Sequence, residues 1–84
     1  MTYEVVILRK AQRELAALPR AAYTRVRAAL RGLGMSPRGP GAKKLRGREA
    51  WRMREGDYRV LYEIDDDSRV VTVVHVGHRR EVYR

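Results

Sequence analysis

The chain has 84 residues, of which 19 are Lys or Arg and 10 are Asp or Glu, so its formal net charge is +9. This length allows one domain, spanning residues 1–84, with a thin core, since a chain so short buries only about 60 % of its unfolded surface. Cys is absent, which excludes disulfides and thiolate metal sites. No apolar run approaches the roughly 20 residues of a membrane span, and no signal-peptide pattern opens the chain, so we expect a cytoplasmic protein without a membrane partner.

The first half of the chain predicts a strand followed by a helical hairpin. Residues 3–8 are β-branched, aliphatic or aromatic, which indicates a strand buried on both faces. An apolar period of three to four residues then predicts an amphipathic helix from residue 9 to Pro19, which ends it and can open the next helix. The same period continues to residue 33, and we expect Gly34 and Pro37 to stop this second helix.

The second half predicts a loop and three strands. Residues 36–48 are rich in Pro and Gly, and the strands are expected at 50–55, 58–65 and 70–76. Gly56 and Asp57 form a tight-turn signal, and the acidic run 65–67 is interpreted as a solvated turn. The order β-α-α-β-β-β predicts an α+β fold, with the N-terminal helical hairpin packed on a mainly antiparallel four-stranded sheet.

Alternation along the hairpin brings basic side chains together. If Gly56-Asp57 is the turn, Arg54 lies opposite Arg59, and Arg52 shares their face. Like charges directly opposite each other are unfavourable, so the pair is either a solvent-screened edge or a seat for a phosphate group. Arg predominates over Lys and suits planar, bidentate phosphate contacts, which favours a polyanionic partner such as RNA.

Other candidate residues flank this hairpin. The loop carries basic residues that either contact phosphate or keep the loop soluble, among them Lys43, Lys44 and Arg46. The C-terminal tail adds Arg79, Arg80 and Tyr83, and Tyr83 could stack on an unpaired base or cover the edge of the core. His78 is the candidate for proton transfer, because histidine titrates near neutral pH. His75 is interpreted as a packed residue at a strand end, and no metal site is expected.

The ordered blocks 41–47, 51–54, 56–62 and 76–83 resemble the RelE/ParE toxin superfamily, and most of all its RelE branch. These blocks read GAKKLRG, WRMR, GDYRVLY and VGHRREVY. The resemblance covers nearly the whole chain and implies the toxin of a type II toxin–antitoxin pair.

RelE-like activity would be ribosome-dependent cleavage of mRNA in the A site, with no metal or cofactor. The 2′-hydroxyl would attack the adjacent phosphate and leave a 2′,3′-cyclic phosphate and a 5′-hydroxyl. The implied partners are the ribosome, mRNA and a cognate RelB-like antitoxin that masks the basic face and places the complex on operator DNA.

The resemblance also implies roles for individual residues. Arg59 would stabilise developing charge on the phosphate, and Arg79 would neutralise that phosphate or serve the leaving group. Tyr83 would orient a base, and Arg46 would help to hold RNA. Arg52 and Arg54 stand where the best-known members have two lysines, and arginine is a poor general base because it does not lose its proton. Proton abstraction would fall to His78, to another group or to the ribosome, unless electrostatics alone drive a slow reaction.

Two other functions fit the same sequence. A ParE-like toxin would inhibit DNA gyrase without cutting RNA, and the loss of the lysine pair keeps this alternative open. A plain nucleic-acid-binding module would grip the backbone with a steep salt dependence and no cleavage.

Overall fold

The computed structural model describes residues 2–78. In that range the elements are β1 (Glu4–Ile7), α1 (Arg9–Ala16), α2 (Arg20–Met35), β2 (Lys43–Lys44), β3 (Trp51–Glu55), β4 (Tyr58–Asp65) and β5 (Val70–His78). The predicted α+β class and the helical hairpin are confirmed. The strand count is corrected from four to five, because residues 43–44, expected in a loop, pair with β3 as the short strand β2.

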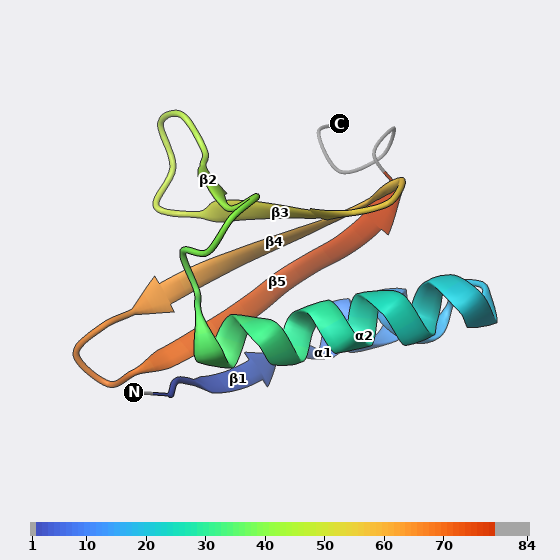
Figure 1. Ribbon diagram of the computed structural model, residues 1–84, viewed down its shortest axis with the longest axis horizontal. Helices are drawn as coiled ribbons and strands as arrows, with labels where there is room; N and C mark the ends of the chain where they lie inside the picture. The colour runs from blue at the N-terminus through green and yellow to red at the C-terminus, as the bar shows by residue number, and fades with distance from the viewer. Residues whose placement is uncertain (1, 79–84) are drawn as a thin grey trace.

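The helices form one layer and the sheet another (Figure 1). The strand order is β1-β5-β4-β3-β2, with β1 parallel to β5 and the remaining neighbours antiparallel. Apolar side chains of α1 and α2 pack against one face of β4 and β5 to make the core. Its fully buried members include Val26, Val60, Tyr62, Val71 and Val73. No helix of the described residues covers the second face of the sheet.

The expectation that the first strand is buried on both faces is wrong. β1 is an edge strand, and the helical hairpin covers only one side of it. Val5 and Ile7 are therefore partly buried, whereas Glu4 and Val6 are exposed, with Val6 at 38 %. An apolar run of this length fits a half-covered edge as well as a central strand, so composition alone could not separate them.

Gly34 does not stop the second helix, as the sequence suggested, because α2 continues through it to Met35. The Tyr3 N–H donates to the Gly34 carbonyl at 2.7 Å, so β1 passes against the helix here. A Cβ on residue 34 would lie 2.9 Å from the Tyr3 carbonyl oxygen. This glycine permits a close approach rather than a helix end.

The hairpin register is confirmed. Arg54 pairs with Arg59, Met53 with Val60, and Trp51 with Tyr62 around the Gly56-Asp57 turn. β5 extends two residues beyond the predicted strand, to His78, and its register against β4 shifts between Leu61 and Tyr62. These pairings determine which side chains share each face of the sheet.

A polar network anchors the loop that follows α2. Arg38 donates two hydrogen bonds to Asp66, at 3.0 and 2.8 Å, and its guanidinium lies 5.3 Å from the centre of the Trp51 ring. The Tyr3 hydroxyl donates to Asp66 at 2.6 Å, and the Tyr62 hydroxyl donates to the Pro37 carbonyl at 2.7 Å. The acidic turn, interpreted from the sequence as merely solvated, therefore ties together the N-terminus, this loop and β3.

Candidate functional site

Three arginines share the face of the sheet that carries no helix. Alternation along β3 and β4 puts Arg52, Arg54 and Arg59 on the side opposite the core residues Val60 and Tyr62. We call this surface the arginine face. Arg54 lies directly across from Arg59, so the predicted juxtaposition of two cations is present. Neighbouring strands are about 5 Å apart, which puts these guanidinium groups within reach of one anion.

Arg59 is the buried member of the group. Only 8 % of the residue is exposed, and its Nε has no hydrogen-bond partner among residues 2–78. Its neighbour on β5 is Gly77, which contributes no side chain beside it. Buried donors are nearly always paired in folded proteins, so an unpaired cationic donor is a candidate position for a ligand acceptor. Phosphate oxygens are well-matched acceptors for guanidinium groups.

A second row of the arginine face runs across four strands. Lys43 pairs with Arg52, Arg52 with Leu61, and Leu61 with His75. Leu61 is only 3 % exposed, so it supplies an apolar floor between the polar side chains. A low-polarity floor strengthens the electrostatic attraction between guanidinium groups and an anion above it.

The predicted RNA-binding residues do not all lie on the arginine face. Lys43 shares the face of Arg52, whereas the register sends Lys44 to the opposite side, where its Nζ lies 3.5 Å from Glu49 Oε2. Arg46 is exposed in the turn between β2 and β3. Arg79, Arg80 and Tyr83 lie outside the described residues.

His78 is on the other side of the sheet from the three arginines. It pairs with Tyr58, on the face of Val60 and Tyr62, and the two aromatic rings meet edge-on with centroids 5.8 Å apart. The sequence put His78 beside the cationic cluster because it precedes Arg79, but its partner Tyr58 lies on the face opposite Arg59.

The sequence reasoning missed a contact between α1 and β5. Glu14 accepts a hydrogen bond from the Val76 N–H at 3.0 Å, and its Oε2 lies 2.7 Å from His75 Nδ1. β1 pairs with β5 only up to Val73, so the following residues have a free edge that α1 covers. Helical periodicity marks Glu14 as polar but carries no signal for what the helix lies against.

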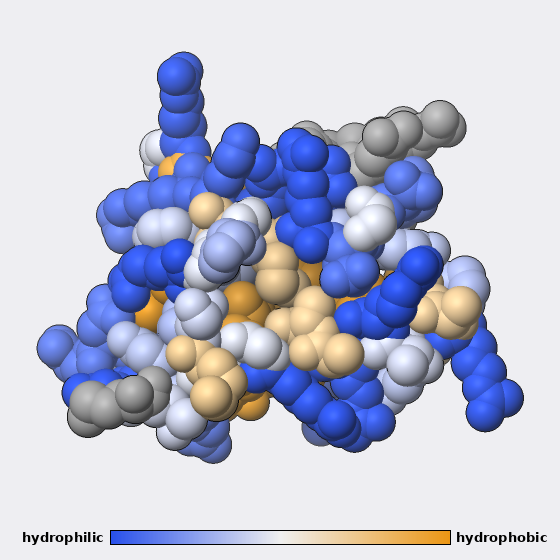
Figure 2. All heavy atoms as spheres, in the orientation of Figure 1, coloured by the Kyte–Doolittle hydropathy of each residue, from blue (hydrophilic) through white to orange (hydrophobic). Residues whose placement is uncertain are grey.

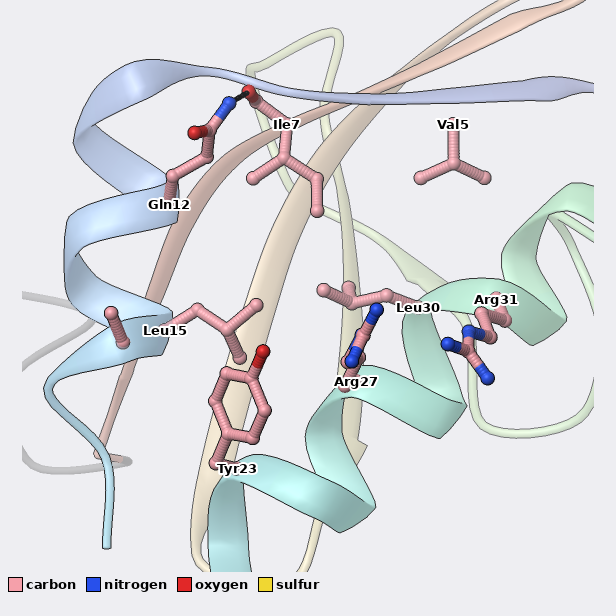
Figure 3. Close-up of a pocket in the computed structure, with 9 residues that line it drawn as sticks. Val5, Ile7, Gln12, Leu15, Tyr23, Arg27, Leu30 and Arg31 are labelled. Carbon is pink, nitrogen blue, oxygen red and sulfur yellow. Dashed lines mark hydrogen bonds between the residues drawn. The ribbon is translucent and has the colours of Figure 1, made fainter. Parts of the chain in front are cut away.

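An apolar groove opens between α1, α2 and β1 (Figure 3). It has a volume of about 410 Å³, and Val5, Ile7, Leu15 and Leu30 are among the residues that line it. Figure 3 also shows the Gln12 side chain donating to the Ile7 carbonyl, at 2.8 Å, which links α1 to β1. Arg27 and Arg31 add cationic side chains to this groove. Figure 2 shows apolar residues exposed between hydrophilic ones on the face of the molecule that α2 crosses.

Two kinds of site find no support within residues 2–78. No group of three His, Asp or Glu side chains there is arranged to hold a metal ion. Neither helix is long and apolar enough to cross a bilayer.

Comparisons with known proteins agree with this architecture. The family described as the ParE toxin of type II toxin–antitoxin system, parDE, matches residues 5–83. The toxin RelG of Mycobacterium tuberculosis is 48 % identical over 31 residues, a match that spans 37 % of this chain and 36 % of RelG.

Solved structures extend the similarity to the whole fold. The toxin–antitoxin complex RelBE2 of M. tuberculosis contains a chain 33 % identical, with a TM-score of 0.83, over 94 % of this chain and 100 % of that one. The archaeal RelE–RelB complex of Pyrococcus horikoshii gives 30 % identity and a TM-score of 0.83, over 98 % of this chain and 100 % of its counterpart. The resemblance noted in the sequence is confirmed, and the chain belongs to the ParE toxin family of type II toxin–antitoxin systems, within the RelE-like toxin superfamily.

Proposed function

We propose that this toxin is a ribosome-dependent, metal-independent endoribonuclease that cuts mRNA in the A site and so inhibits translation in the cytoplasm. The observation that carries the proposal is the arginine face. Arg52, Arg54 and Arg59 share one side of the sheet, and the buried Arg59 Nε lacks an acceptor within the described residues. A scissile phosphodiester would supply that acceptor and the negative charge that three guanidinium groups attract.

The arginines would stabilise negative charge and would not transfer protons. As the 2′-oxygen attacks phosphorus, negative charge builds on the non-bridging oxygens, and fixed guanidinium donors stabilise it more strongly in the transition state than in the ground state. The O2′–P bond forms, the P–O5′ bond breaks, and the products are a 2′,3′-cyclic phosphate and a 5′-hydroxyl. Arg79 and Tyr83, assigned by resemblance to the phosphate and a flanking base, stay predictions.

Cleavage mapping on translating ribosomes tests this function. The purified chain is added to ribosomes on a defined mRNA, and the new RNA ends are mapped to the nucleotide. We expect cuts within the A-site codon, reduced about 10²–10³-fold in Arg59→Ala, the loss seen when one oxyanion donor is removed. Arg25→Ala is the matched control, because it removes the same charge from an exposed position on α2. Equal losses in both variants, or intact mRNA with the wild type, would contradict the proposal.

A second candidate function is inhibition of DNA gyrase without RNA cleavage. The family description that matches residues 5–83 is that of ParE toxins, and both family lysine positions here hold arginine. This alternative predicts intact mRNA together with stalled gyrase cleavage complexes in the presence of the chain. The same protein preparation can be assayed for both outcomes.

We further propose that a RelB-like antitoxin neutralises this chain and carries it to operator DNA. The similar solved structures from M. tuberculosis and P. horikoshii are complexes with antitoxins. The groove between α1, α2 and β1 combines an apolar lining with Arg27 and Arg31, so it suits an amphipathic antitoxin segment with acidic residues. Charge reversal in an Arg27→Glu/Arg31→Glu variant should weaken the complex with the cognate RelB-like antitoxin, as measured by calorimetry. Unchanged affinity would place the antitoxin elsewhere.

A further inference from the structure

The contact between Glu14 and His75 lies at the edge of the arginine face and has no role in the charge stabilisation proposed above. We infer that His75 is a catalytic residue, the base that accepts the 2′-hydroxyl proton, and that Glu14 is the positioning residue that orients it. This inference rests on the proposed cleavage, for which it names the proton acceptor that Arg52 and Arg54 cannot be.

Glu14 is fixed at both carboxylate oxygens. Its Oε1 accepts the Val76 N–H at 3.0 Å, and its Oε2 lies 2.7 Å from His75 Nδ1 and 3.9 Å from Lys10 Nζ. The approach of Nδ1 is bent away from ideal hydrogen-bond geometry despite the short distance, so the contact is an electrostatic one at this ring angle. A carboxylate at this position favours the tautomer with hydrogen on Nδ1, which leaves a lone pair on Nε2.

The opposite edge of the imidazole is accessible. His75 keeps 21 % of its side-chain exposure although Nδ1 itself is buried. Nε2 is not among the buried polar atoms without a partner, and it makes no hydrogen bond within residues 2–78. An accessible edge of this kind is required of a proton acceptor, because the bound substrate must reach the nitrogen that carries the lone pair.

The strand register puts the backbone of His75 in line with Arg52, next to the β-bulge between Leu61 and Tyr62 and at the edge of β5 that α1 covers. It pairs with Leu61, which pairs with Arg52, so two strand spacings of about 5 Å separate its backbone from that of Arg52. Gly77 pairs with Arg59, which makes His75 and Arg59 diagonal neighbours at about 7–8 Å. Long side chains at diagonal positions are within reach of each other, so both could contact one ligand.

The cleavage step needs only His75, Arg59, Glu14 and water. His75 Nε2 takes the proton from O2′–H, and O2′ attacks the adjacent phosphorus while Arg59 stabilises the charged oxygens. The P–O5′ bond breaks, and the departing 5′-oxygen takes a proton from water. Imidazolium then returns the proton to solvent, with its charge offset by Glu14 at Nδ1 during the step.

Single-turnover cleavage in the ribosomal A site separates a catalytic from a structural role. His75→Ala should lower the cleavage rate about 10²–10⁴-fold, with little change in affinity for the ribosome. Added imidazole should restore part of that rate, because the missing base can diffuse into the vacated space. Glu14→Gln keeps an acceptor for the Val76 N–H but removes the charge, and its rate should fall about 10-fold without rescue by imidazole.

His78→Ala tests the competing histidine in the same assay. Loss of cleavage in His78→Ala with rescue by imidazole, while His75→Ala cleaves normally, would overturn the inference and leave the proposed function intact. The inference is also overturned if His75→Ala is folded by circular dichroism and slow, yet imidazole does not restore its rate. A wild-type chain that leaves A-site mRNA uncut would overturn the proposed function and this inference together.

Discussion

Arg59 is the residue on which the proposed phosphate site most depends. Its guanidinium is largely removed from water, its Nε is unpaired within the described residues, and another cation, Arg54, lies directly across from it. Each of these features destabilises the free protein, because buried charges require partners and like charges repel. In the proposed complex, a bound phosphate group would offset all three at once.

The destabilisation caused by the buried Arg59 side chain can be measured through the free energy of unfolding of the free protein. Replacing Arg59 with Met retains the volume and removes the unpaired charge, so the free energy of unfolding should rise by about 1–2 kcal/mol while cleavage is lost. Urea denaturation of the two proteins supplies the comparison. Arg25→Met, at an exposed helix position, should change the free energy by less than about 0.5 kcal/mol. A destabilised Arg59→Met protein would show that this guanidinium supports the fold instead.

The contacts of Asp66, which anchor the loop that follows α2, can be tested by varying the pH. The hydrogen bonds from Arg38, and then the one from Tyr3, lower the pKa of its carboxyl group to about 2. The unfolded value is about 4, so these contacts stabilise the fold above that pH and lose their effect as the pH falls through about 2. The difference in free energy of unfolding between wild type and Asp66→Asn should therefore narrow across this interval in acid. A difference that stays constant across the interval would rule out the anchor.

Some of these residue-level features could be read from the sequence and others could not. Strand alternation predicted that Arg52, Arg54 and Arg59 share a face, because that depends only on one hairpin and its turn. The contacts of Glu14 and Asp66 depend on how distant segments meet, and each residue looks like an ordinary solvated carboxylate along the chain. The error for His78 has a local cause instead, because strand alternation puts it on the face of Tyr58 and away from Arg59.

At the level of elements, local turn residues predicted the β3–β4 hairpin. The two edge strands of the sheet could not be predicted from such local signals. Gly56 adopts a φ of 59°, which glycine tolerates without strain, so the turn and the register of β3 and β4 follow from sequence. The place of β1 beside β5 is a pairing between the two ends of the chain, for which no local signal exists. Residues 43–44 look like loop because their pairing with β3 is so short.

Two glycines of α2 give a matched test of how β1 docks on the helix. Gly34→Ala puts a Cβ 2.9 Å from the Tyr3 carbonyl oxygen, which must push β1 away and should cost about 1–3 kcal/mol of stability. At Gly32 a Cβ would meet nothing within 4 Å, so Gly32→Ala should stabilise the helix by about 0.5–1 kcal/mol. Thermal unfolding of both variants shows the contrast. Stabilisation by both substitutions would mean that β1 does not approach Gly34 closely.

At the level of the whole molecule, positive charge is spread wider than the site. α2 carries four exposed arginines and no acidic residue: Arg20, Arg25, Arg27 and Arg31. Composition therefore favoured a polyanionic partner but gave no location for it, because the net charge of +9 is not confined to the arginine face. In the proposed function, long-range attraction would steer the chain toward RNA, and local geometry would select the phosphate that is cut.

The salt dependence of RNA binding distinguishes long-range attraction by the net charge from local contacts on the arginine face. Binding to single-stranded RNA should weaken steeply with salt, and an Arg52→Gln/Arg54→Gln variant should reduce the slope of log affinity against log salt by about 1.4, for two lost phosphate contacts. An Arg20→Gln/Arg25→Gln variant loses the same charge away from the arginine face and should keep a slope near that of the wild type. Titrations by fluorescence anisotropy at several salt concentrations give the slopes. Equal reductions in both variants would mean that RNA binds without preference for the arginine face.

If the arginine face holds the phosphodiester that is cut, cleavage depends on where positive charge is lost. The two charge-matched double variants, one on the arginine face and one on α2, test this most directly. The measurement is the single-turnover rate of mRNA cleavage in the ribosomal A site. We predict that Arg52→Gln/Arg54→Gln loses cleavage by at least about 10²-fold, whereas Arg20→Gln/Arg25→Gln cuts at nearly the wild-type rate. Equal rates in the two variants would contradict the claim, because the reaction would then depend on total charge and not on where the sheet puts these guanidinium groups.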